Sequence, residues 1–126
     1  WDVFPAEDWT LGNHVTEFSD CFYKEGKGDA DLLVANIAFA EEMSARGLTG
    51  ADLGAVQLWP RAGAPAGLEN AISFKWITGY PSLSAYANFT NVLWNEGLTT
   101  AWNALYGDIV ACDSGRVYQS QVMNRP

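Results

Sequence analysis

The amino-acid sequence predicts a single α+β domain built around one antiparallel sheet. Its 126 residues match the usual size of one domain. Hydrophobic residues make up 48% of the chain, and six residues are Trp, so the composition predicts a packed core rather than disorder. Strand-like alternation and helix-like spacing occur in separate segments, so both kinds of element are expected.

The chain begins with an irregular segment that leads into a strand. Residues 1–13 mix Pro, Gly, acidic and aromatic residues without a regular period. We therefore expect an extended N-terminal arm ahead of a domain that spans residues 14–126. Residues 15–23 alternate between two sets of side chains, which predicts the first strand.

A helix is expected after the first strand. Apolar residues at helical spacing, among them Leu33 and Ile37, predict a helix from Asp29 to about Arg46. Gly47 follows directly, and glycine there commonly takes the left-handed conformation that ends a helix. The first crossover is therefore helical.

The rest of the chain predicts three more strands and a broken helix. Residues 54–59, 72–78 and 115–123 alternate and are expected to be strands two, three and four. Residues 81–110 show helical spacing that is interrupted at Gly97, so the second crossover is expected as two helical segments.

This order of elements, β-α-β-β-α-β, predicts a ferredoxin-like sandwich, because each right-handed crossover leaves a gap that a strand of the other half fills. We expect a four-stranded antiparallel sheet in the order 4-1-3-2, with the helices on one face. Strands one and four are then neighbours, which brings Cys21 close to Cys112. The two cysteines are expected either to form a disulfide, which would add about 4 kcal/mol of stability, or to remain buried thiols.

Charge and motifs exclude several classes of partner. Seven Lys and Arg against fifteen Asp and Glu give a formal charge of −8, which repels nucleic-acid phosphates and anionic membrane surfaces. The acidic residues are scattered and the sequence has no nucleotide-binding glycine motif, so no metal and no cofactor are expected. The sequence has no apolar run long enough to span a bilayer, so no membrane partner is expected either.

Three segments are distinctive: CFYKEGKGDADLL at residues 21–33, FKWITGY at residues 74–80 and VACDSGRVYQSQV at residues 110–122. They resemble the second half of a family of uncharacterised, exported proteins of marine bacteria, in which two similar halves each carry a Cys-x-x-x-(Asp/Glu)-Gly-Lys turn and a late cysteine. The resemblance covers residues 14–124. It implies an exported protein, periplasmic or extracellular, whose leader is absent from this chain. It also implies a homodimer or pairing with a second similar half, as in dimeric α/β-barrel proteins.

The sheet face away from the helices is the first candidate site. By alternation it should carry Glu17, Ser19, Cys21 and Tyr23 from the first strand and Ser73, Lys75 and Ile77 from the third. Glu17 and Lys75 lie on adjacent strands of the expected order, so we expect a partly buried ion pair. Such a pair would either be structural, within an interface, or have pKa values shifted toward acid–base chemistry.

Two further groups of residues are candidates. His14 is the only histidine and stands at the edge of the first strand, where it would act as a general base if it projected into a cavity. Four tryptophans either line a pocket for a hydrophobic ligand or belong to the core. They are Trp59, Trp76, Trp94 and Trp102.

Two functions fit this architecture. The first is an exported, non-catalytic binding or assembly module that uses its open sheet face to form a dimer or barrel, with room for a small apolar ligand. The alternative is a cofactor-independent oxygenase or isomerase of the dimeric α/β-barrel type. Its acid–base groups would come from Glu17, Tyr23, Lys75 or His14, an assignment that rests on fold analogy alone.

Overall fold

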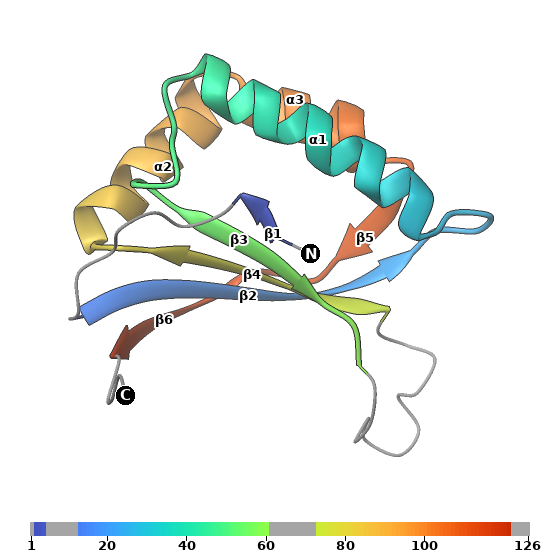
Figure 1. The fold of residues 1–126 in the computed structure, drawn as a ribbon, viewed down its shortest axis with the longest axis horizontal. Coiled ribbons are helices and arrows are strands. Elements are labelled where there is room, and N and C mark those ends of the chain that lie inside the picture. The colour runs from blue at the N-terminus through green and yellow to red at the C-terminus, as the bar shows by residue number, and fades with distance from the viewer. Residues whose placement is uncertain (1, 5–12, 61–72, 122–126) are drawn as a thin grey trace.

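The computed structural model describes residues 2–4, 13–60 and 73–121. This part of the chain is an α+β domain in which the helices lie together on one side of a sheet (Figure 1). Within the described residues, the structure contains no helix that is both long and apolar enough to cross a membrane. The predicted fold class is therefore confirmed at this level.

The strands are β1 (Asp2–Phe4), β2 (Asn13–Tyr23), β3 (Gly54–Leu58), β4 (Phe74–Tyr80), β5 (Val110–Cys112) and β6 (Arg116–Gln121). The helices are α1 (Asp29–Ala45), α2 (Leu83–Asn95) and α3 (Leu98–Tyr106). β1 falls within the segment that the sequence assigns to an irregular arm. Residues 1, 5–12, 61–72 and 122–126 lie outside the described residues, and with them most of the expected arm, the first residue of the expected third strand and the end of the expected last strand.

The sheet differs from the expected four-stranded order 4-1-3-2. Its strands follow the order β1-β3-β4-β2-β5, and β6 also pairs with β2. β1 extends the sheet beside β3, and β5 is a further strand that lies ahead of the one expected at residues 115–123, where the structure has β6. All of these pairings are antiparallel. A ferredoxin-like four-stranded sheet is thus not what the structure shows.

The interruption between β5 and β6 has a local cause. Cys21 pairs with Cys112, and Phe18 pairs with Arg116. The chain from Cys112 to Arg116 therefore contains one residue more than the stretch of β2 that it faces. Such an extra residue breaks a ladder as a β-bulge does. The side chain of Asp113 then accepts a hydrogen bond from the backbone N–H of Asp20 at 2.8 Å, a bond that a regular ladder would supply from the backbone.

Cys21 and Cys112 form a disulfide. They lie directly opposite each other in the β2–β5 pair, and Cys21 is fully buried. The structure therefore confirms the disulfide, and the alternative of two buried thiols is wrong.

The second crossover is two helices, as the sequence predicts. Ser82 caps α2 by accepting a hydrogen bond from the backbone N–H of Ala85 at 3.1 Å. Gly97 has a φ of 80°, a left-handed conformation that side chains disfavour. The chain turns at Gly97 between α2 and α3, so the glycine explains the break.

Helix α1 buries a different face from the one its spacing suggests. Leu32, Phe39 and Met43 are buried, whereas Leu33 and Ile37 are exposed. The helix is apolar around most of its circumference, so the period alone does not select the buried stripe. The buried stripe packs with Phe74 and Tyr80 of β4 into a core between the sheet and the helices.

The two faces of β2 are also opposite to the prediction. Cys21 belongs to the core beneath the helices, and the side chains two and four residues before it share its face. Lys75 lies on the other face, where it pairs with Asp20. The prediction failed because Phe18 and Phe22 make the opposite set of β2 side chains look like the buried one.

A buried polar network joins α1, β3 and α3. The amide of Asn36 donates to Oε1 of Gln57 at 2.8 Å, and the amide of Gln57 donates back to Oδ1 of Asn36 at 3.1 Å. The hydroxyl of Tyr106 donates to the same Oδ1 at 3.0 Å. All three side chains are buried, so each bond replaces water that the core excludes.

We expect the disulfide to stabilise the fold strongly. The cysteines are 91 residues apart in the sequence, so the link restricts the unfolded chain and contributes about 4 kcal/mol. Reduction should lower the midpoint urea concentration of unfolding of the wild type. The double variant Cys21→Ala/Cys112→Ala should unfold at the same midpoint as the reduced wild type. The double variant, as the control, should not respond to reductant. An unchanged wild-type midpoint on reduction would contradict this expectation.

The polar network should show a graded response to mutation. Tyr106→Phe removes one hydrogen bond and should lower the free energy of unfolding by about 1 kcal/mol, while Asn36→Ala removes three buried hydrogen bonds at once and should cost about 3 kcal/mol. Urea denaturation measures both values, and Asn88→Ala on an exposed helix position is the control. An equal loss of unfolding free energy in Tyr106→Phe and Asn36→Ala would contradict the central position of Asn36 in the network.

Candidate binding site

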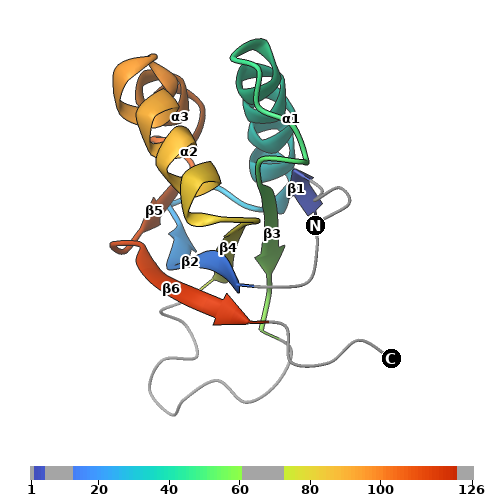
Figure 2. The same ribbon diagram turned by 90° about the vertical axis from the view of Figure 1, so that its left-hand side faces the viewer.

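A cavity of about 360 Å³ lies between the sheet and the helices. Figure 2 shows α1 on one side and the α2–α3 pair on the other, as two separate ridges above the same face of the sheet. Side chains from β2, β3 and β4 form the floor, and side chains from all three helices form the walls. The aromatic lining residues are Phe39, Trp76, Tyr80, Phe89, Trp94 and Trp102.

Antiparallel pairing places the residues of the floor. Glu17 lies opposite Thr78, and Ser19 lies opposite Trp76. Side chains that are paired in this way project from the same face of the sheet. The floor therefore includes a carboxylate, two aliphatic hydroxyls and an indole, beneath walls that are mostly apolar.

Ring contacts hold the aromatic walls in place. Tyr106 packs edge-on against Trp76, with ring centroids 5.1 Å apart, and contacts Trp102 at 5.3 Å. On the other side, Tyr80 contacts Phe89 at 5.4 Å. These separations are those of favourable aromatic pairs, so the walls are set before any ligand arrives.

Glu17 is the carboxylate of the cavity floor. Its Oε2 atom accepts a hydrogen bond from the hydroxyl of Tyr80 at 3.4 Å. Burial raises the pKa of Tyr80 above its ordinary range, and the nearby charge of Glu17 raises it further. The tyrosine therefore stays neutral and acts as a donor to the carboxylate.

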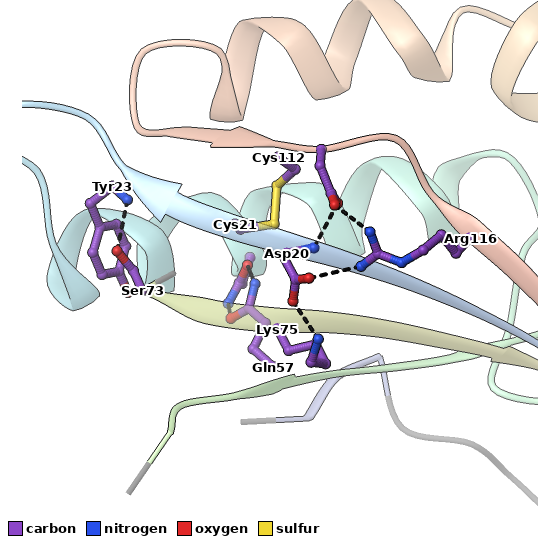
Figure 3. Close-up of a disulfide and its surroundings, with 10 residues drawn as sticks. Asp20, Cys21, Tyr23, Gln57, Ser73, Lys75, Cys112 and Arg116 are labelled. Atoms are coloured by element: carbon purple, nitrogen blue, oxygen red, sulfur yellow. Dashed lines mark hydrogen bonds and ion pairs between the residues drawn. A yellow bond between two sulfur atoms is a disulfide. The ribbon is translucent and has the colours of Figure 1, made fainter. Parts of the chain in front are cut away.

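The predicted ion pair between Glu17 and Lys75 is wrong. Lys75 pairs with Asp20 on the other face of the sheet, and Arg116 binds the second oxygen of Asp20 at 2.9 Å (Figure 3). Arg116 also pairs with Asp113. The register explains this result, because Asp20 lies opposite Lys75 whereas Glu17 lies opposite Thr78.

Tyr23 and His14 do not line the cavity. Tyr23 donates a hydrogen bond from its hydroxyl to Asp29 and accepts one from the indole of Trp59 at 3.3 Å. Burial and the bond to Asp29 raise the pKa of Tyr23 to about 12. His14 is buried in β2 at the position opposite Ser120. Glu17 is thus the only one of the four predicted acid–base candidates that the structure places at the cavity.

The predicted tryptophans divide between two places. Trp76, Trp94 and Trp102 line the cavity, whereas Trp59 contacts Phe74 at 5.6 Å between ring centroids and is not part of the lining. Sequence reasoning missed Tyr80, because it ended the third strand at residue 78 while β4 continues to Tyr80. Continued alternation through Trp76 and Thr78 is the signal that would have found it.

The lining offers few groups for metal binding. Within the ranges 2–4, 13–60 and 73–121, no cluster of three or more His, Cys, Asp or Glu side chains could hold a metal ion. What the cavity can provide is aromatic surface, several hydroxyls and the Glu17 carboxylate. That combination suits recognition of a small organic molecule.

Tyr80 should make the stability of the protein fall at alkaline pH. Above about pH 10, the unfolded state loses a phenol proton that the folded state keeps, so unfolding becomes more favourable as pH rises. Denaturant unfolding between pH 9 and pH 12 should therefore show a shallower pH dependence in Tyr80→Phe than in the wild type. Tyr118→Phe, which removes a half-exposed phenol from the other face, is the control. The same slope in the wild type and Tyr80→Phe would contradict the assignment.

Comparisons with known proteins assign no function to the site, so its own geometry has to carry the interpretation. Neither a scan against protein-family models nor a search of curated proteins finds a match for this chain. The resemblance to exported two-half proteins therefore stays a prediction.

Proposed function

We propose that this chain is a binding module whose cavity holds a small ligand with an aromatic or apolar body. The observation that carries the proposal is the cavity itself. Its volume of about 360 Å³ and its mostly apolar lining with several aromatic rings are those of small-molecule sites. A few polar groups on the floor would orient the ligand.

The surroundings of the cavity support a preformed site. The disulfide joins β2 to β5 beside the floor, and Cys112 itself lines the cavity. The hydrogen bonds of Asn36 tie the two helical ridges together through Tyr106. A site that is already ordered loses less entropy when a ligand binds.

The geometry favours binding over the alternative of an oxygenase or isomerase. An acid–base mechanism needs groups that converge on the reacting atoms. Lys75 lies on the opposite face of the sheet, and Tyr23 and His14 lie outside the lining. Glu17 with the neutral Tyr80 offers an anchor for a ligand rather than a proton-transfer pair.

The open face of the sheet supports a second part of the proposal, which is assembly with another copy or a similar half. Phe22, Leu58 and Tyr118 are about half exposed, at 47%, 51% and 52%, and all three project from the face away from the helices. Apolar surface of this kind is common at protein interfaces. A buried disulfide supports export, since disulfides persist in oxidising compartments.

A ferredoxin-like ancestry would account for the arrangement of the elements. β2, α1, β3, β4, the α2–α3 pair and β6 follow one another in the order of that fold. β1 and β5 would then be additions at the edges of the sheet. This finer description of the fold remains part of the proposal.

Filling the cavity should abolish binding. Ser19 lies on the floor, so Ser19→Phe would occupy the space of a ligand while leaving the exposed surface unchanged. With 2-phenylethanol as the probe, NMR should show concentration-dependent shifts of the indole N–H signals of Trp76 and Trp102 in the wild type, and none in Ser19→Phe. Ser44→Phe, at an exposed position on α1, is the matched control and should bind as the wild type does. Absence of shifts in the wild type with this probe and with its charged phenyl analogues would refute the proposed cavity function.

A further inference from the structure

The ionisable groups that line the cavity carry only negative charge. Glu17 and Asp113 belong to the lining, and among the described residues no Lys, Arg or His does. An anionic ligand would therefore meet two carboxylates, and like charges repel each other. The formal charge of −8 for the whole chain acts in the same direction.

The two carboxylates differ in how far their charge is already compensated. Asp113 accepts the backbone hydrogen bond of Asp20 and pairs with Arg116, and these contacts hold its pKa below the usual value. Glu17 accepts a hydrogen bond from Tyr80, but within the described part of the chain no basic side chain lies within ion-pair distance of it. Glu17 is thus the carboxylate whose negative charge is available to pair with a ligand.

The position of Glu17 is set by the backbone beside it. A Cβ atom at position 115 would overlap Oε1 of Glu17, so the carboxylate lies against a space that only glycine leaves open. Gly115 belongs to the turn between β5 and β6. The segment that separates β5 from β6 therefore makes room for the carboxylate at the cavity floor.

Aromatic side chains line the same space. Trp76, Trp102 and Tyr80 line the cavity together with Glu17. The face of an aromatic ring is electron-rich and attracts a cation, most strongly in Trp. A carboxylate and several aromatic rings around one small cavity are complementary to an organic cation.

We propose that the ligand of the cavity is an organic ammonium ion with an aromatic or apolar body. Its cationic group would lie at Glu17, and its body would lie among the rings of Trp76 and Trp102. This inference rests on the proposed binding function and adds the charge class of the ligand to it.

Three probes that share a phenyl ring but differ in charge distinguish the effect of ligand charge from that of ligand shape. They are 2-phenylethylamine, which is a cation at neutral pH, 2-phenylethanol, which is neutral, and phenylacetate, which is an anion. Titrations followed by the Trp76 and Trp102 indole signals should give a Kd for the amine about tenfold lower than for the alcohol. Phenylacetate should bind more weakly than the alcohol.

Two variants test whether Glu17 causes the preference. Glu17→Gln keeps an acceptor for the Tyr80 hydroxyl but removes the charge, so the amine should bind only as well as the alcohol while the alcohol is unaffected. Gly115→Ala should displace the carboxylate of Glu17, and so weaken the binding of the amine more than the binding of the alcohol. Glu41→Gln, which removes one charge at an exposed position on α1, is the matched control and should retain the full preference.

The outcomes distinguish the two proposals. If the amine and the alcohol bind equally well to the wild type, or if Glu17→Gln keeps the preference for the amine, the ammonium inference is overturned and the cavity function stands. If none of the three probes moves the indole signals, both proposals fail. Tighter binding of phenylacetate would overturn the charge argument directly.

Discussion

The register of β2 is the constraint on which the rest of the structure depends. β4 pairs with it along residues 15–21, and β5 and β6 pair with its two ends. Because side chains alternate along a strand, a shift of one residue would exchange everything above the sheet with everything below it. The disulfide lies within this ladder and holds the register covalently. Which side chains reach the cavity and which form the Asp20 ion pairs follows from that one alignment.

The elements of the fold could be predicted from the sequence, but their orientation could not. Alternation and helical spacing located most elements, and Gly97 correctly marked the break in the second crossover. The buried face of a strand or helix can be chosen from the sequence only when its two faces differ in polarity, and the faces of β2 and α1 do not differ enough. β2 carries phenylalanines on the face away from the helices, and α1 is apolar around most of its surface. The short strand β5 was also missed, because it directly follows a helical pattern and is only three residues long.

The candidate site follows the same logic. Three of the four tryptophans singled out in the sequence line the cavity: Trp76 and Trp102 are partly buried against the core, whereas Trp94 is largely exposed. The carboxylate of Glu17 was assigned to the wrong surface for the reason just given. Its position below the helices conflicts with simple hydrophobic patterning. Such local departures from a consistent pattern are where functional residues are expected.

The phenol of Tyr106 connects the architecture to the way a ligand would reach the site. Its ring supports Trp76 and Trp102, and its hydroxyl is bonded to α1. Spreading the two ridges apart would therefore break the polar network and disturb the walls at once. Trp94, by contrast, lines the cavity but is 68% exposed on α2. An exposed indole of this kind changes rotamer rapidly and without movement of the backbone, so this part of the wall is the one that can adapt to an incoming ligand.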